Sequence, residues 1–310
     1  MSGEHNHVHN TNKKALLLSF IVITAYMIVE AIGGLLTNSL ALLSDAGHML
    51  SDSISLGIGL LALIFGAKSA DYTKTYGYKR FEILAAVFNG VTLILIAGYI
   101  FYEAVNRFKH PPEVASNGML IIALVGLFVN IFVAWLLMRG DTHENLNVRA
   151  AFLHVIGDLL GSIGAIAAAL LIMFFDWGIA DPIASVIVAL LVLVSGWRVT
   201  RESVHILMEG TPANVHLDDV IHAIQSVPGV NGVHDLHVWC ITSGQNALSC
   251  HITVDGTMTV QESQHVQETI AHELEHQNIS HTTVQVESNT TVHDPSIICT
   301  HTAQAHVHQH

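Results

Sequence analysis

The stretch Ser39–Phe65 reads SLALLSDAGHMLSDSISLGIGLLALIF, and it decides how the rest of the chain is interpreted. About 20 mostly apolar residues let a helix cross the hydrocarbon core of a bilayer, and this stretch is long and apolar enough to do so. It also carries Asp45, His48 and Asp52, which are ionisable groups at a depth where charge is costly and usually functional. The stretch therefore predicts a membrane-spanning helix with a site inside the membrane.

Five other stretches have the same apolar character, so the sequence predicts six membrane spans. The loops between them are short, which favours one compact helical bundle. The first span is longer than the apolar core of a signal peptide, and the last contains Asp181-Pro182 near its start, where proline suits a first helical turn. The predicted spans are Ala15–Leu36, Ser39–Phe65, Phe81–Tyr102, Met119–Met138, Ala150–Phe174 and Ile179–Val199.

The composition supports a membrane protein. Of the 310 residues, 51% are hydrophobic and only 12% are charged. A soluble domain has about 25% charged residues, so an ordinary soluble enzyme and a disordered chain are both excluded. The three cysteines give no even disulfide framework, and they fit a reducing compartment or metal ligation better.

The basic residues predict the orientation. With the N-terminus placed inside the cell, ten of the 12 Lys and Arg residues are cytoplasmic, and only Arg107 and Lys109 lie outside. This distribution follows the positive-inside rule, and an even number of spans then places the C-terminus inside as well. Residues 202–310 hold 12 acidic residues, 15 His and no Lys or Arg, which disfavours nucleic acid as a partner. We therefore expect a multi-pass cell-membrane protein with both termini in the cytoplasm.

Histidine is also concentrated at the two ends of the chain. Such tracts often bind metal loosely, and a disordered polar tail or, at the C-terminus, a cloning remnant is an equally good interpretation. The residues are His5, His7 and His9 at the start, and His301, His306, His308 and His310 at the end.

Two predicted spans carry the same pair of polar residues. His48 and Asp52 lie four residues apart on the second span, and His154 and Asp158 repeat this spacing on the fifth. Residues four apart share one helix face, so two such faces packed together supply two nitrogen and two oxygen ligands. Four ligands of these types suit zinc. Hydrogen-bonded His–Asp pairs that tie helices together are the alternative, and the repetition in mid-span favours a metal site.

The same ligands predict exchange of metal for protons. Two carboxylates neutralise a divalent ion, whereas the metal-free site leaves two anions side by side. Repulsion between like charges and removal from water both favour protonation of such carboxylates. Metal must displace those protons in order to bind, so protons enter as metal leaves.

Other polar residues in the predicted spans indicate a functional role less strongly. Asp45 lies one turn before His48, where it would guide ions at the outer mouth of a pathway or cap the helix. For Glu30, Asn89 and Asn130 we favour hydrogen bonds between helices over a role in the pathway.

Residues 209–295 predict a small cytoplasmic α/β domain. The order helix, strand, strand, helix, strand suits a small sheet with its helices on one side. His272 and His276 match the His-Glu-x-x-His pattern of zinc proteases, but an exposed acidic helix is the better interpretation in so small a domain. The predicted elements are His216–Val227, Val233–Ile241, Ala247–Val254, Val260–Gln277 and Thr283–Glu287.

Together these features resemble the cation diffusion facilitator family, in particular its bacterial zinc, cadmium and cobalt exporters. The resemblance covers nearly all of residues 14–290. The stretches that carry it are Leu40–Asp52, Tyr76–Glu82, His154–Asp158, Asp181-Pro182 and Val233–Trp239.

The resemblance implies a homodimer of six-helix subunits that exports divalent metal by alternating access against protons. It assigns His48, Asp52, His154 and Asp158 to the transport site, with the two-His, two-Asp composition of zinc exporters. It also implies that the cytoplasmic part is a metallochaperone-like dimerisation domain that binds regulatory metal. The ligands implied there are His234, His251, His281 and Glu287, with His237 and Cys299 as further candidates.

We therefore expect a cytoplasmic tail (1–13), a transmembrane domain (14–208), a cytoplasmic domain (209–295) and a His-rich tail (296–310). The expected function is proton-coupled export of zinc, with cadmium or cobalt as further substrates, by a lipid-embedded protein that is not an enzyme. One alternative is a membrane-anchored metal sensor that transports nothing. Another is an intramembrane zinc enzyme, which four converging ligands disfavour because catalytic zinc keeps an open position.

Overall fold

A computed structural model describes the backbone of residues 4–65, 70–110, 112–138, 146–242, 244–290 and 296–297. Side chains are described over the same ranges except for residues 4–16, 55–56, 58–65, 134, 136–138, 146–158 and 160. The chain divides into two compact units, Met1–Ser203 and Val204–His310. The division falls inside the sixth long helix, a few residues before the boundary that we predicted after residue 208. Each unit is described by itself.

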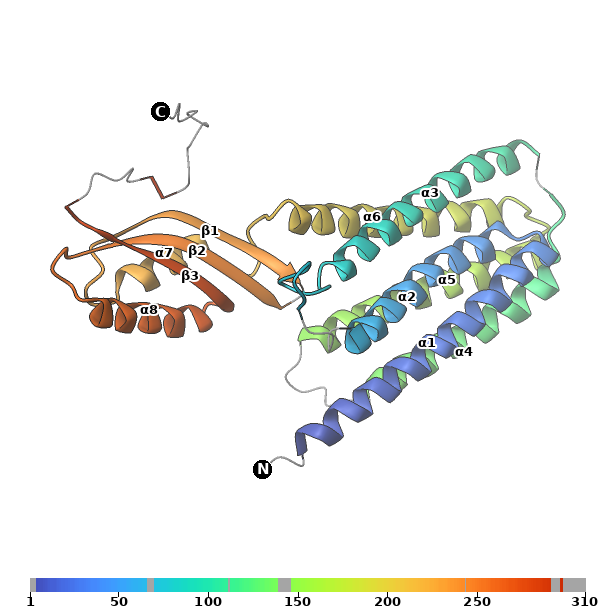
Figure 1. Cartoon of the computed structure of the whole chain (residues 1–310). Coiled ribbons are helices and arrows are strands. Elements are labelled where there is room, and N and C mark those ends of the chain that lie inside the picture. The colour runs from blue at the N-terminus through green and yellow to red at the C-terminus, as the bar shows by residue number, and fades with distance from the viewer. Residues whose placement is uncertain are drawn as a thin grey trace. The chain divides into compact units, whose positions relative to one another are not determined.

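The first unit is built from long helices (Figure 1). Two of them continue beyond the predicted spans, to Lys109 and to Leu207. The extension to Lys109 is supported by an ion pair one turn apart, in which Arg107 Nε lies 3.0 Å from Glu103 Oε1. The helices are α1 (Glu4–Thr37), α2 (Leu40–Phe65), α3 (Phe81–Lys109), α4 (Ser116–Met138), α5 (Leu146–Phe175) and α6 (Ala180–Leu207).

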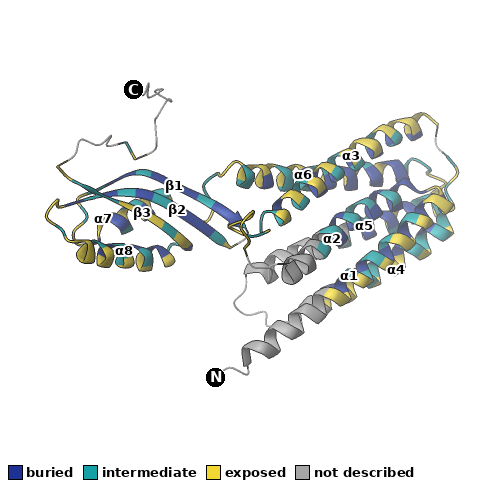
Figure 2. Ribbon diagram, viewed as in Figure 1, coloured by how far each residue is buried: buried dark blue, intermediate teal, exposed yellow. Residues whose placement is uncertain are grey.

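Four helices are long and apolar enough to cross a membrane, judged over the residues that the structure describes. They are α1, α3, α4 and α6. Large hydrophobic side chains are exposed on them, such as Leu36 on α1 and Phe88 on α3. Figure 2 shows exposed residues along these helices. Lipid is the solvent that suits such faces. That α2 and α5 also cross the membrane stays a prediction, because many of their side chains lie outside the described residues.

The helices of this unit contact one another in a defined pattern. Helix α1 contacts α2 and α4, α5 contacts α4 and α2, and α3 contacts α2. Helices α3 and α6 meet at Gly90 and Gly196, where a Cβ atom on Gly90 would lie 2.9 Å from the carbonyl oxygen of Gly196. Only glycine at these two positions lets the backbones approach so closely.

The carboxylate of Asp181, on α6, caps the N-terminus of α2. It is fully buried and accepts hydrogen bonds from Ser39 Oγ (2.6 Å), Leu40 N (2.8 Å) and Ala41 N (3.1 Å). Arg107 of α3 is buried as well, and its Nη1 lies 3.6 Å from Asp181 Oδ2. We predicted Asp181-Pro182 as a helix start, which is confirmed, but the carboxylate serves a different helix 140 residues away.

The second unit has the predicted order of elements. Strand β1 pairs with β2 antiparallel, β2 pairs with β3 parallel, and α8 makes the crossover between the parallel strands. Both helices pack on one face of this sheet through a core that includes Ile224, Leu248 and Ile270 (Figure 1). The elements are α7 (Leu217–Gln225), β1 (Gly232–Thr242), β2 (Gln245–Val254), α8 (Val260–Glu275) and β3 (Ile279–Ser288).

Helix α8 starts with a reciprocal cap. The backbone N–H of Glu262 donates to Thr259 Oγ1, and the backbone N–H of Thr259 donates to Glu262 Oε2 at 2.8 Å. The hydrogen bonds from Thr259 lower the pKa of the Glu262 carboxyl. This cap fixes where α8 begins and therefore where β3 returns to the sheet.

Candidate metal sites

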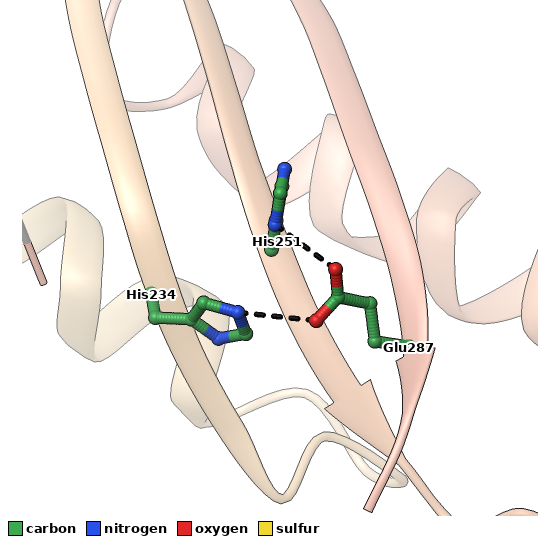
Figure 3. Close-up of side chains that lie close together, drawn as sticks. All are labelled: His234, His251 and Glu287. Carbon is green, nitrogen blue, oxygen red and sulfur yellow. Dashed lines mark ion pairs between the residues drawn. The ribbon is translucent and has the colours of Figure 1, made fainter. Parts of the chain in front are cut away.

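Three side chains from three neighbouring strands converge in the second unit (Figure 3). They are His234 on β1, His251 on β2 and Glu287 on β3, and their ligand atoms all lie within 4.8 Å of one another. Glu287 bridges the two rings: its Oε2 lies 3.1 Å from His234 Nε2, and its Oε1 lies 3.1 Å from His251 Nδ1. We call these three residues the cytoplasmic cluster.

The strand register explains why these residues meet. His234 pairs directly with His251 across β1 and β2, and Glu287 is the diagonal neighbour of His251 on β3. Cys250 and Ile252, on either side of His251 in the sequence, are buried in the core. Because side chains alternate along a strand, His251 lies on the sheet face away from α7 and α8, together with His234 and Glu287.

The cluster has the composition of a zinc site. Neutral imidazole nitrogen and carboxylate oxygen bind zinc at about 2.0–2.2 Å, so ligand atoms in a tetrahedral site lie about 3.4 Å apart. The 3.1 Å separations between the carboxylate and each ring are close to this spacing. Three protein ligands leave a fourth position for water or a further ligand.

Asp235 lies beside the cytoplasmic cluster and contacts His251, a contact that the sequence did not predict. Its Oδ2 lies 3.5 Å from His251 Nε2 and its Oδ1 lies 3.1 Å from His237 Nε2. The β1 register shifts between His234 and His237, and Asp235 has a left-handed backbone with φ of 49°. This bulge brings the consecutive residues 234 and 235 to the same site. Asp235 is thus a second carboxylate beside the His251 ring, and it would hold that ring in an orientation suited to metal binding.

His281 is not brought to the cytoplasmic cluster. It lies on β3 opposite Ala247, whereas Gln285 lies opposite His251. Six residues of extended strand separate His281 from Glu287, which is about 20 Å. The side chain nearest to Glu287 along its own strand is Gln285, whose Nε2 donates to Glu287 Oε1 at 2.7 Å. Our four-ligand expectation therefore differs from the structure in this one residue.

The other candidate ligands of the second unit lie apart from the cluster or outside the described residues. Cys250 is buried in the core, and burial raises its thiol pKa to about 12, which disfavours the thiolate that binds metal. His272 on α8 and His276, the C-cap residue of that helix, are exposed, with ring centroids 5.2 Å apart. Cys299 and the terminal histidines lie outside the described residues.

We expect substitution of Glu287 by glutamine to weaken zinc binding at the cytoplasmic cluster by at least tenfold. Mutation of a residue that only supports a metal ligand typically reduces metal affinity by about 10–100-fold. Removal of an anionic ligand itself reduces the affinity further. Equilibrium binding of radioactive zinc to the full-length protein measures the effect. The variant His281→Ala is expected to bind as the wild type does, and equal losses in the two variants would instead support the four-ligand set.

The structure describes the side chains of two of the four residues predicted to form the transport site. His48 and Asp52 lie one turn apart on α2, with Asp52 buried and His48 partly buried. His154 and Asp158 belong to α5, but their side chains lie outside the described residues. The register of the two helices places the four predicted ligands relative to one another along α2 and α5.

The register of α2 and α5 is set by a close contact between Asp45 and Gly161. A Cβ atom on Gly161 would lie 2.5 Å from Asp45 Oδ1. Earlier on α2, Leu42 shares a core with Ala165 and Ala169, which come later on α5, so the helices run antiparallel. Three residues along α2 from this contact lead to position 48, and three residues back along α5 lead to position 158.

Seven residues along α2 from Asp45 lead to position 52, and seven residues back along α5 from Gly161 lead to position 154. The two His-x-x-x-Asp pairs therefore lie at matching levels of the antiparallel helices, with each histidine position level with an aspartate position. Helices α2 and α5 are in contact, as a metal site shared between them would require.

Hydrogen bonds between helices support α2 and α5 around these levels. Asn89 Nδ2 on α3 donates to Ser51 Oγ on α2 at 2.9 Å. Asn130 Nδ2 on α4 donates to Ser162 Oγ on α5 at 3.3 Å. The predicted interhelical role of the two asparagines is thus confirmed. Thr24 Oγ1 and Ser53 Oγ, 2.6 Å apart, join α1 to α2 in the same way.

We expect the substitution Gly161→Ala to reduce metal transport by about tenfold. A loss of about 1–2 kcal/mol in the interaction between α2 and α5 would produce a change of this size. The added methyl group would overlap the Asp45 carboxylate and separate α2 from α5. Gly164→Ala is the matched control, since a Cβ atom there has no neighbour within 4 Å. Equal activities of the two variants would show that this contact does not set the helix register.

Comparison with known proteins gives a consistent result. Residues 16–208 match the cation efflux transmembrane domain, and residues 212–289 match the cation efflux protein cytoplasmic domain. The chain is 60% identical over 296 residues to a Bacillus subtilis protein named cadmium, cobalt and zinc/H(+)-K(+) antiporter, covering 95% of each chain.

Two more distant relatives have related names. The zinc transporter ZitB of Pectobacterium atrosepticum is 42% identical over 294 residues, which cover 93% of this chain and 89% of the relative. The metal cation efflux system protein CzcD of Cupriavidus metallidurans is 40% identical over 288 residues, which cover 93% and 90%.

Proposed function

This chain belongs to the cation efflux family, and on that premise we propose that it exports zinc from the cytoplasm in exchange for protons. Members of this family are multi-pass membrane transporters of metal cations and not enzymes. Cadmium and cobalt are proposed as further substrates, because the Bacillus relative carries both in its name. That name also includes potassium as a counter-ion beside the proton.

The observation that carries the proposal is the matching level of the two His-x-x-x-Asp pairs, which follows from the contact between Asp45 and Gly161. Four ligands on two contacting helices form a complete tetrahedral set, with no open position for catalysis. Two aspartates balance the charge of one divalent ion. When the ion leaves, protons neutralise the same carboxylates, so metal and protons use the site alternately.

A regulatory role is proposed for the cytoplasmic cluster. Its three ligands come from three strands of one small sheet, so bound metal would tie the strands together at that face. The matched domain is the dimerisation domain of the family, and we propose a homodimer in which zinc at this cluster favours transport. Both termini lie in the cytoplasm in this arrangement, as the distribution of basic residues predicts.

The test is zinc uptake into inside-out membrane vesicles that contain the full-length protein, with an imposed pH gradient. We expect zinc to accumulate and to be released when an ionophore collapses the gradient. A membrane-anchored sensor would bind zinc without accumulating it. Binding with no uptake above that of vesicles lacking the protein would therefore overturn the proposal in favour of the sensor.

A further inference from the structure

Two histidines at the end of α8 take no part in the sites described above. His272 lies in the last turn of α8, and His276, four positions later, is its C-cap residue and has helical backbone angles. Residues four apart lie on the same face of a helix. Both side chains are exposed, and their rings meet edge to face with centroids 5.2 Å apart and planes at 68°.

This ring geometry fits two imidazoles that share one metal ion. Zinc binds imidazole nitrogen at about 2.0–2.1 Å, so the two rings of a tetrahedral site have centroids about 5 Å apart. The two histidines of the cytoplasmic cluster, His234 and His251, have centroids 5.3 Å apart and planes at 81°. The pair on α8 therefore has nearly the same ring geometry as the histidines of the cytoplasmic cluster.

The pair on α8 is separate from the cytoplasmic cluster. Helix α8 packs on one face of the sheet through Val266, Ile270 and Leu274, whereas the cytoplasmic cluster lies on the other face. His272 and His276 are exposed and lie outside this buried stripe. A metal ion bound by the pair would therefore not compete for the ligands of the cluster.

The charges around the pair favour a cation. Helix α8 contains Glu262, Glu268, Glu273 and Glu275 and no Lys or Arg. Residues 202–310 also contain no Lys or Arg, so no such side chain of this unit repels a metal ion. Glu275 follows His272 by three positions, which places a carboxylate on the same face of the helix as the two rings.

The ring nitrogens of the pair are available as ligands. Among the residues that the structure describes, no hydrogen bond or ion pair engages the ring of His272 or His276, and each ring contacts the other. A metal ion would therefore displace no existing polar contact of these rings.

We propose that His272 and His276 bind one divalent transition-metal ion as a two-nitrogen chelate on the surface of α8. Imidazole ligands suit zinc, copper and nickel, whereas magnesium and calcium prefer oxygen. Water and the nearby carboxylate of Glu275 complete the coordination. The ion is open to solvent and exchanges readily, and the His-Glu-x-x-His spacing binds metal here without forming a protease active site.

The test is chemical modification of histidines in the purified full-length protein, measured residue by residue with mass spectrometry. Diethyl pyrocarbonate modifies free imidazole nitrogen, and a bound metal ion protects it. We expect zinc to protect His272 and His276 together, at the same zinc concentration. Magnesium at that concentration is expected to protect neither residue, because it prefers oxygen ligands.

The variant His276→Ala distinguishes a chelate from two independent rings. A second linked contact can raise affinity by about 10²–10⁴-fold, so this variant should raise the zinc concentration that protects His272 by at least about tenfold. His276 is exposed at the helix end, so the substitution removes no buried contact. The matched control is His265→Ala, at an exposed histidine about 10 Å from His272 along α8, and it should leave the protection of His272 unchanged.

Three results would overturn the site on α8. One is absence of protection at His272 in the wild-type protein, and another is unchanged protection of His272 in His276→Ala. The third is equal protection of His265, which would show that zinc binds weakly at every exposed histidine. None of these measurements depends on transport, so the site is tested independently of the proposed export.

Discussion

Substitution of Asp52 by alanine is expected to abolish zinc uptake, and Asp158→Ala is expected to do the same. Each change removes one of four ligands and one of the two negative charges that balance the metal. Supporting residues around metal sites typically contribute about 10–100-fold in affinity, and a direct anionic ligand contributes more, so we expect a loss of at least 100-fold. Initial rates of zinc uptake into inside-out vesicles measure this loss.

The control for Asp52→Ala is Ser53→Ala. Ser53 is the next residue on α2 and joins it to α1 through Thr24, so the control weakens helix packing without touching a ligand. We expect it to retain most of the wild-type rate. Uptake that survives in Asp52→Ala, or that is lost equally in Ser53→Ala, would contradict a transport site at this level of α2.

Substitution of Asp181 by alanine is expected to cause the largest loss of stability in the membrane unit. The change removes three hydrogen bonds to the first turn of α2, and it also removes the buried carboxylate 3.6 Å from Arg107, which keeps its ion pair with Glu103. Removing one partner from a buried charge pair typically costs about 3–5 kcal/mol. In a unit of this size 1 kcal/mol shifts the midpoint of thermal unfolding by about 2–4 °C, so the midpoint should fall by about 6–20 °C.

Thermal unfolding of the purified full-length protein in detergent measures the effect of Asp181→Ala. The control is Asp176→Asn, at an exposed aspartate directly after α5 whose backbone is left-handed, with φ of 51°. Asparagine adopts this conformation readily, so the control should unfold as the wild type does. Equal midpoints for the two variants would show that the cap of α2 is not a main source of stability.

The membrane unit could be predicted from the sequence because its signals are local. Apolar stretches of sufficient length mark the helices, and the spacing of His48 and Asp52 is visible within one turn. The cap from Asp181 to Ser39 could not be predicted, because it depends on how α6 meets α2. The contact between Asp45 and Gly161 is of the same kind, since a glycine in a small-residue helix gives no sign of the carboxylate that fills its space.

The cytoplasmic cluster was predicted in part. His234 and His251 lie on predicted strands, and Glu287 ends a third, so strand pairing alone brings them close. Asp235 was missed because regular alternation places it on the opposite face from His234, and a bulge changes this locally. His281 was misplaced because β3 starts at Ile279 and extends the whole segment, which carries His281 away from Glu287.

The most direct test of the transport site is X-ray absorption at the zinc edge. The full-length variant His234→Ala/Glu287→Ala, which lacks two ligands of the cytoplasmic cluster, would be loaded with one zinc ion per subunit. We predict four-coordinate zinc with two imidazoles and two carboxylate oxygens at about 2.0–2.2 Å. Sulfur in the coordination shell, or a spectrum unchanged by the additional substitution Asp52→Ala, would contradict the central claim that zinc crosses the membrane at this site.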